Sequence, residues 1–137
     1  MPEEEQRREL ALLRLNRAKE QLSYIPGILD LGDYKTVANR SYYSVFYAMR
    51  AVLALDGADF KKHSGIISEF RKRYIKTGVF PEKLSDIIGE LFSVRSGCDY
   101  DDFYVVSKEK AKLQYENAAV FVETVSLFFQ ENGLLRE

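Results

Sequence analysis

The chain has 137 residues, and its 20 Lys and Arg against 21 Asp and Glu give a formal net charge of −1. This length predicts one domain over residues 1–137, and a composition of 46% hydrophobic and 30% charged residues excludes a disordered or fibrous chain. The near-zero charge excludes a global attraction to nucleic acid, so any RNA contact must come from a local patch.

The chain has a single cysteine, Cys98, and a single histidine, His63. This excludes an intramolecular disulfide and the common zinc sites, which draw on several Cys and His ligands. No apolar run approaches the ~20 residues of a membrane span, and the acidic start, Met-Pro-Glu-Glu-Glu, is unlike a signal peptide. Phosphate loops, dinucleotide fingerprints and nucleophile elbows are absent. We therefore expect a cytoplasmic protein with no metal, no cofactor and no membrane contact.

Apolar residues recur with helical spacing through nearly the whole chain, and no segment alternates as a strand does. The first helix is predicted over residues 3–31, with Leu10 and Leu13 on its apolar stripe. Pro26 lies inside it and is expected to kink or split it, because proline cannot donate the backbone hydrogen bond of a helix interior.

The same spacing predicts further helices, which are separated by glycine, proline and acidic segments. They are expected over residues 34–55, 64–76, 81–98 and 107–132. Asp33 is the predicted N-cap of the second helix, whereas the acidic and aromatic residues 99–106 predict a loop. Helices joined by short connections favour an all-α antiparallel bundle of four to five helices.

Arginines interrupt the apolar faces of two predicted helices. Arg95 follows Leu91 on one face of the fourth helix, and Arg40 and Arg50 share a face with tyrosines of the second. An unpaired buried charge costs several kcal/mol, so each arginine needs a partner. Arg95 either pairs with aspartates of residues 99–102 or faces a phosphate with its planar fork of donors. The spacing alone does not separate these two interpretations.

The second predicted helix also carries a set of aromatic side chains, Tyr42, Tyr43, Phe46 and Tyr47. Such rings can stack on RNA bases, although helical spacing is more typical of a core or a dimer interface. His63 begins the third helix, where its imidazole can act as an acid or base near pH 7 or satisfy a neighbouring carbonyl.

Two charged clusters have both a functional and a structural interpretation. The first, called here the basic patch, consists of Lys61, Lys62, Arg71, Lys72, Arg73 and Lys76. It either contacts RNA or forms a solvated face, and the second is more common for a charge run. The other cluster consists of Asp99, Asp101 and Asp102. Its carboxylates can hold a magnesium ion, but ion pairs within the loop are favoured because magnesium sites usually borrow substrate phosphates.

Four blocks of the sequence, taken in order, carry a resemblance to a known family. They are Ala-Asn-Arg-Ser-Tyr-Tyr-Ser-Val-Phe-Tyr-Ala at 38–48, Lys-His-Ser-Gly at 62–65, Lys-Thr-Gly at 76–78 and Arg-Ser-Gly-Cys-Asp-Tyr-Asp-Asp-Phe at 95–103. Together they resemble the HEPN family, and most closely its short stand-alone prokaryotic branch. The resemblance covers about residues 10–125, whereas any single block would be weak.

The resemblance implies a bundle of four or five helices that forms a homodimer. Active members carry an arginine, four to six residues and then a histidine near the end of the fourth helix. Two copies of this motif face each other across the dimer cleft and cleave RNA without a metal. The stand-alone members are often encoded beside a minimal nucleotidyltransferase, with which they act as toxin and antitoxin. Other members bind nucleotides or serve as assembly modules.

Within this resemblance, Arg95 matches the motif arginine and Tyr100 stands where the histidine would be. A tyrosine phenol, with an ordinary pKa of about 10, is a poor base at pH 7 but can donate a proton. His63 can supply the missing base if the third helix packs against the fourth. The resemblance also implies that the partner transferase modifies a tyrosine behind the arginine, for which Tyr100 and Tyr104 are the candidates.

We therefore expect a toxin-like HEPN protein that cleaves RNA, or one that descends from such a ribonuclease. Its catalytic cleft is expected to contain Arg95, Asp99 and Tyr100. The residues expected to bind substrate or nucleotide are Arg40, Tyr43, Tyr47, Arg50 and His63. The alternative is a non-catalytic nucleotide-binding or partner-binding module that uses the same cleft. A purely structural role, in which arginines and aspartates lock the dimer, also remains open.

Overall fold

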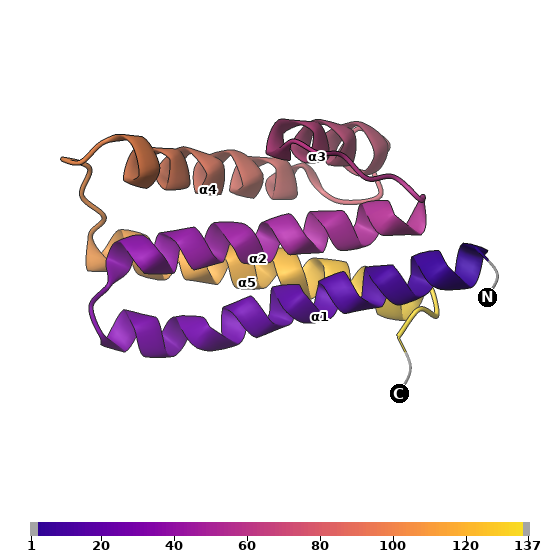
Figure 1. Cartoon of the computed structure of the whole chain (residues 1–137), viewed down its shortest axis with the longest axis horizontal. Helices are drawn as coiled ribbons and strands as arrows, with labels where there is room; N and C mark the ends of the chain where they lie inside the picture. Colours follow the sequence, from indigo (N-terminus) through magenta and orange to yellow (C-terminus); the bar gives the residue numbers. More distant parts are fainter. Residues whose placement is uncertain (1–2, 136–137) are drawn as a thin grey trace.

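The structure is a computed structural model of the chain and describes residues 3–135. Within that range it contains helices and no strand, which confirms the all-α prediction. The elements are α1 (Glu3–Asp30), α2 (Tyr34–Leu55), α3 (His63–Phe70), the π-helical η1 (Arg71–Ile75), α4 (Glu82–Tyr100) and α5 (Lys108–Glu131). The long helices run along the long axis of the bundle, and α3 lies at one end of it (Figure 1).

The central helix is α2, which packs against α1, α3, α4 and α5. Its first turn is capped as predicted, because the Asp33 side chain accepts a hydrogen bond from the backbone N–H of Thr36 at 3.3 Å. Tyr42, Met49 and Leu53 are at most 1% exposed. The aromatic half of α2 is therefore anchored in the core and positions its tyrosines for the site described below.

The face of α1 that is buried differs from the predicted stripe. Leu10 and Leu13 are 40% and 48% exposed, whereas Ala11, Leu15 and Ala18 are fully buried. Small alanines let α1 approach α2 and α5 closely, so the buried face is set by its neighbours rather than by its largest side chains. The helix continues through Pro26 to Asp30, so of the two predicted effects, a kink or a split, the split is wrong.

The predicted third helix, 64–76, is divided into the α-helical α3 and the π-helical η1. The N–H of Lys76 donates to the carbonyl of Arg71 at 2.9 Å, which is the five-residue hydrogen bond of a π-turn. The wider turn keeps both Phe70 and Ile75 buried although they are five residues apart. Phe70 also packs on Phe80, with ring centroids 5.6 Å apart, and this holds α3 and η1 on the bundle.

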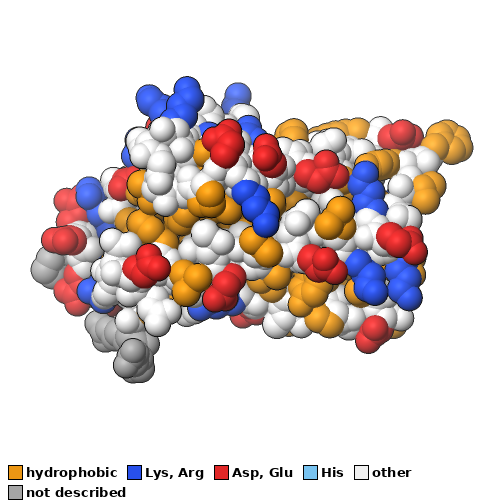
Figure 2. All heavy atoms as spheres, turned by 180° about the vertical axis from the view of Figure 1, so that it is seen from behind, with side chains coloured by type: hydrophobic (Ala, Val, Ile, Leu, Met, Phe, Trp, Pro, Cys, Tyr) orange, Lys and Arg blue, Asp and Glu red, His pale blue; other side chains and the backbone are white. Residues whose placement is uncertain are grey.

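The fourth helix extends to Tyr100, two residues beyond the prediction. Asp99, which was expected in a loop, therefore lies on α4 one turn after Arg95. The following connection places Tyr104 against Gly97 and leaves Phe103 92% exposed. Figure 2 shows the corresponding hydrophobic tip, flanked by acidic side chains, at one end of the molecule. No helix among the described residues is long and apolar enough to cross a membrane.

Candidate functional site

The guanidinium of Arg95 lies against two tyrosine rings of α2. Its central carbon is 5.1 Å from the Tyr42 ring centroid and 5.7 Å from that of Tyr43. Its Nε is 2.9 Å from a carboxylate oxygen of Asp99, and its Nη2 donates to the Tyr43 hydroxyl at 3.4 Å. The predicted pairing of Arg95 with an aspartate is thus present in the structure, whereas a phosphate opposite Arg95 stays a prediction.

Arg95 keeps hydrogen-bonding capacity within this site. Its side chain is 18% exposed, and the buried Nε makes an ion pair with Asp99 without an aligned hydrogen bond. The long contact to Tyr43 is the one hydrogen bond that its side chain makes to a described residue. A guanidinium carries N–H donors on all its nitrogens, so several remain for an anion. The arrangement suits a phosphate or carboxylate ligand.

His63, the first residue of α3, lies in the same cluster. Its ring centroid is 4.1 Å from that of Phe46, and its Nδ1 is 3.1 Å from the Tyr42 hydroxyl. Partial burial lowers the pKa of His63, and the positive charges of Arg95 and Arg50 lower it further. The imidazole is therefore neutral at pH 7 and can accept a proton.

Tyr42 connects His63 to Arg95. Its ring is 1% exposed and contacts the imidazole and the guanidinium, at centroid distances of 6.0 Å and 5.1 Å respectively. Burial raises the pKa of Tyr42 to about 12, although the charge of Arg95 opposes that rise. The hydroxyl thus stays protonated, and its oxygen can accept a hydrogen bond from the Nδ1–H tautomer of His63, the tautomer in which Nε2 has a free lone pair for a substrate proton. His63 and Arg95 are both brought to the Tyr42 ring because α3 and α4 each pack on α2. The catalytic role expected of His63 stays a prediction.

Arg40 and Tyr43, two further predicted binding residues, lie at this cluster. Arg40 donates to Gln21 at 2.8 Å and to Asn39 at 2.7 Å, and its guanidinium carbon is 5.2 Å from the Tyr43 ring centroid. Tyr43 therefore has both Arg40 and Arg95 beside its ring, a cation–π arrangement. These contacts concentrate positive charge next to Arg95.

Arg50 and Tyr47, the other predicted binding residues, lie at the edge of the cluster. Arg50 is 3.5 Å from a carboxylate oxygen of Asp59, and Tyr47 contacts Phe46 with a centroid distance of 6.5 Å. Asp59 also pairs with Arg14 at 3.4 Å, a buried arginine that the sequence reasoning missed. Arg14 lies beside the buried Leu15 on α1, and a polar residue next to the core stripe was its only signal.

Tyr100 and the other tyrosine candidate do not join Arg95 in this chain. A position five residues after Arg95 lies roughly 140° around a helix, whereas Asp99, four residues on, stays on the same face. The side chain of Tyr100 is 84% exposed. Tyr104 packs over Gly97 and is half-buried.

Asp101 accepts a hydrogen bond from the N–H of Phe103 at 3.0 Å. Across residues 3–135, no three His, Cys, Asp or Glu side chains gather as a metal site would require.

Comparison with known proteins gives the family. The family model described as the HEPN domain matches residues 11–129. This chain belongs to the HEPN family. The helical bundle and the position of Arg95 near the end of α4 agree with what the sequence resemblance implied.

Relatives of this HEPN chain come from archaea and bacteria. A protein of Methanocaldococcus jannaschii named "Putative toxin MJ0142" is 28% identical over 130 residues, which cover 95% of this chain and 88% of the relative. A "UPF0332 protein" of Thermotoga maritima is 28% identical over 115 residues, which cover 84% of this chain and 87% of the relative. A second M. jannaschii protein, "Putative toxin MJ0605", is 27% identical over 114 residues, which cover 83% of this chain and 84% of the relative.

Proposed function

We propose that this HEPN chain is the toxin-like member of a toxin–antitoxin pair and cleaves RNA, with Arg95 binding the phosphate and His63 acting as the base. The observation that carries the proposal is the placement of a neutral imidazole and a partly unsatisfied guanidinium on one buried ring, that of Tyr42. The names of two relatives support the toxin assignment.

The proposed reaction is the attack of a ribose 2′-oxygen on its own phosphate. His63 accepts the 2′-hydroxyl proton, the bond from phosphorus to the 5′-oxygen breaks, and that oxygen takes up a proton, which leaves a 2′,3′-cyclic phosphate and a 5′-hydroxyl. Arg95 faces the charge that develops on the phosphate oxygens, and Arg40 adds to the positive field there. The imidazolium formed in the first step can return its proton to the leaving oxygen.

Tyr100 keeps its proposed catalytic role only in the homodimer that the family resemblance implies. In a single chain its exposed side chain is turned away from Arg95, so it can act as a proton donor only at a partner chain's site. Asp99 is proposed to orient Arg95 through their 2.9 Å ion pair. The homodimer and the cytoplasmic setting remain predictions.

A minimal nucleotidyltransferase is the proposed partner. Of the two candidate tyrosines, Tyr100 is the better site of modification because its side chain is 84% exposed, whereas Tyr104 is packed on Gly97. A bulky negative group on Tyr100 would stand beside Asp101 and, in the proposed homodimer, at the partner chain's site. It would repel a phosphate chain and so suppress the toxin.

The proposal is tested by cleavage of a mixed-sequence RNA in EDTA, with wild type compared with Arg95→Ala and His63→Gln. The control is Lys112→Ala, which removes an exposed cation of α5. Each substitution at the site should lower the cleavage rate by about 100-fold or more, and the control should not. Dimerisation and thermal unfolding are recorded on the same samples.

The outcomes separate the parts of this proposal. A wild type that does not cleave RNA would overturn the enzyme assignment. Full activity in His63→Gln together with loss in Arg95→Ala would remove His63 from the mechanism but keep the phosphate site.

A non-catalytic nucleotide-binding module is the second candidate function. It is favoured by the tyrosine at the motif position, Tyr100, and by the aromatic rings around Arg95, which can stack a base. In that case wild type should bind a nucleotide without cleaving RNA, and Arg95→Ala should abolish the binding. Calorimetric titration with adenosine triphosphate measures this directly.

A further inference from the structure

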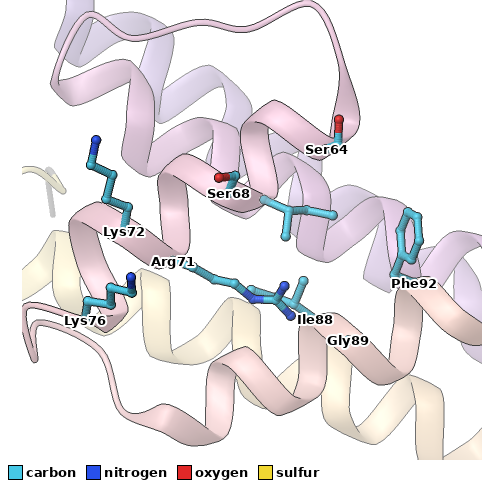
Figure 3. A pocket seen from close by; sticks show the side chains of 9 residues that line it. Ser64, Ser68, Arg71, Lys72, Lys76, Ile88, Gly89 and Phe92 are labelled. Carbon is cyan, nitrogen blue, oxygen red and sulfur yellow. The ribbon is translucent and has the colours of Figure 1, made fainter.

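A separate groove lies between α4 and the segment formed by α3 and η1. Its volume is about 520 Å³, and it does not include Arg95. Its lining includes Ser64, Arg71, Lys72, Lys76, Ile88 and Phe92. In Figure 3 the two lysines stand at one end, Arg71 crosses towards Ile88, and Phe92 stands at the other end. The groove therefore has a basic end and an aromatic end.

The basic end carries positive charge that acidic side chains do not neutralise. Among the described residues, neither Lys72 nor Lys76 forms an ion pair, and both are exposed. Arg73, their neighbour in the sequence, instead pairs with Asp56 and Glu69. Figure 2 shows Lys and Arg side chains projecting from the end of the bundle that bears α3 and η1. Within the basic patch, Arg73 is thus ion-paired, whereas Lys72 and Lys76 are free to meet an anion.

Arg71 is fixed across the floor of the groove. Its Nε donates to Oγ of Ser85 at 3.0 Å, and its Nη2 donates to the carbonyl of the same residue at 3.1 Å. Both acceptors are uncharged, so the guanidinium keeps its charge unpaired and its Nη1 unused within the described residues. A fixed arginine loses little side-chain entropy when it binds a phosphate.

The aromatic end adjoins the Arg95 site. Phe92 is 39% exposed, and its ring centroid is 6.1 Å from that of Tyr42, the residue that contacts both His63 and Arg95. Ser64 lines the groove and directly follows His63 in the sequence. A strand that enters at the lysines and follows the groove therefore reaches the proposed cleavage site.

We propose that this groove binds a single-stranded RNA on one side of the scissile phosphate. Arg71, Lys72 and Lys76 contact the backbone, and Phe92 stacks on one base. The inference rests on the proposed function, because it supplies the path by which the substrate reaches Arg95. A single strand is favoured over a duplex because only unpaired bases expose a face that Phe92 can stack on.

The test is equilibrium binding, followed by fluorescence anisotropy, of a labelled mixed-sequence RNA oligonucleotide whose 2′-hydroxyls are replaced so that it cannot be cut. Lys72→Gln/Lys76→Gln is compared with the matched control Lys19→Gln/Lys112→Gln, which removes the same charge from exposed positions of α1 and α5. The groove variant should bind the RNA at least about fivefold more weakly. The slope of log binding constant against log salt concentration should become shallower by about 0.7 for each lysine removed. The control variant should bind like wild type. Phe92→Leu should weaken binding with the salt slope unchanged, because stacking releases no counterion.

Other ligands and outcomes define when the inference fails. Equal losses in groove and control variants would show a general charge effect and overturn it, as would wild-type affinity in the groove variant. Tighter binding of duplex RNA or of adenosine triphosphate than of the single strand, sensitive to the same lysines, would also overturn it. Since the RNA cannot be cleaved, failure of the groove is measured independently of failure of the enzyme assignment. Thermal unfolding confirms that each variant is folded.

Discussion

The hydroxyl of Tyr42 lies 3.1 Å from Nδ1 of His63, which joins a buried ring of α2 to the first residue of α3. Because Tyr42 is 1% exposed, its position is set by the core, and His63 is therefore held by the core as well. The same ring contacts Arg95 of α4. A single tyrosine thus links three helices at the proposed site.

Removal of that hydroxyl should destabilise the fold. Tyr42→Phe deletes the bond to His63 without changing the ring, so we expect the free energy of unfolding to fall by about 1 kcal/mol. Tyr47→Phe is the control, because no described residue is hydrogen-bonded to its hydroxyl. It should change stability by less than about 0.5 kcal/mol. Urea unfolding measures both, and equal stability of Tyr42→Phe and wild type would contradict the hydrogen bond.

The lowered pKa of His63 should appear in the pH dependence of stability. In the unfolded chain the imidazole titrates near its ordinary pKa of 6.5, whereas burial and the nearby arginines lower the pKa in the folded state. As the pH falls below 6.5, the unfolded state takes up a proton that the folded state resists, so stability decreases. The loss should be smaller in His63→Gln, with urea unfolding compared between about pH 7.5 and 5.5.

The same pKa can be followed directly. His63 is the only histidine of the chain, so its ring resonance is unambiguous in a proton NMR titration. Arg95→Ala should raise its pKa, because a positive charge that opposes protonation is removed. An unchanged titration would show that Arg95 and His63 are farther apart in solution than in this structure.

Asp99 should compete with an anionic ligand for Arg95. Asp99→Asn removes an ion pair between residues four apart on α4, which contributes roughly 0.5 kcal/mol in helices. We expect only that small loss of stability, together with tighter binding of an uncleavable RNA, because the guanidinium is no longer partly neutralised. Weaker RNA binding in Asp99→Asn would contradict this expectation, because it would mean that the orienting effect of the carboxylate on Arg95 outweighs its competition with the ligand.

Gly97 should tolerate no side chain, because a Cβ there would overlap the Tyr104 ring. Gly97→Ala is expected to destabilise the protein by about 1–3 kcal/mol, as overpacking does. The loss should shrink in a Tyr104→Ala background, since the ring that must move is then absent. Gly27→Ala is the control: nothing lies within 4 Å of its added Cβ, and it should stabilise α1 by about 0.5–1 kcal/mol. Thermal unfolding of the four variants tests this packing.

Local signals in the sequence were enough to define the helices and their family. The N-cap at Asp33 and helical spacing predicted α2 over residues 34–55, the range that the structure has. The four sequence blocks predicted the HEPN family, which the family model confirms. The helix and its cap depend on neighbours within a few residues, where backbone hydrogen bonding and capping act, and the order of the blocks can be read along the chain, so the sequence carries both directly.

The tertiary structure alone decided which face of each helix is buried and which side chains meet. Leu10 and Leu13 are exposed because α1 packs through its alanines, a choice that depends on the shapes of α2 and α5. Arg95 and His63 are 32 positions apart, and only the packing of α3 and α4 on α2 brings both to the ring of Tyr42. Periodicity describes a helix by itself, whereas a site shared by three helices depends on how they fill space together.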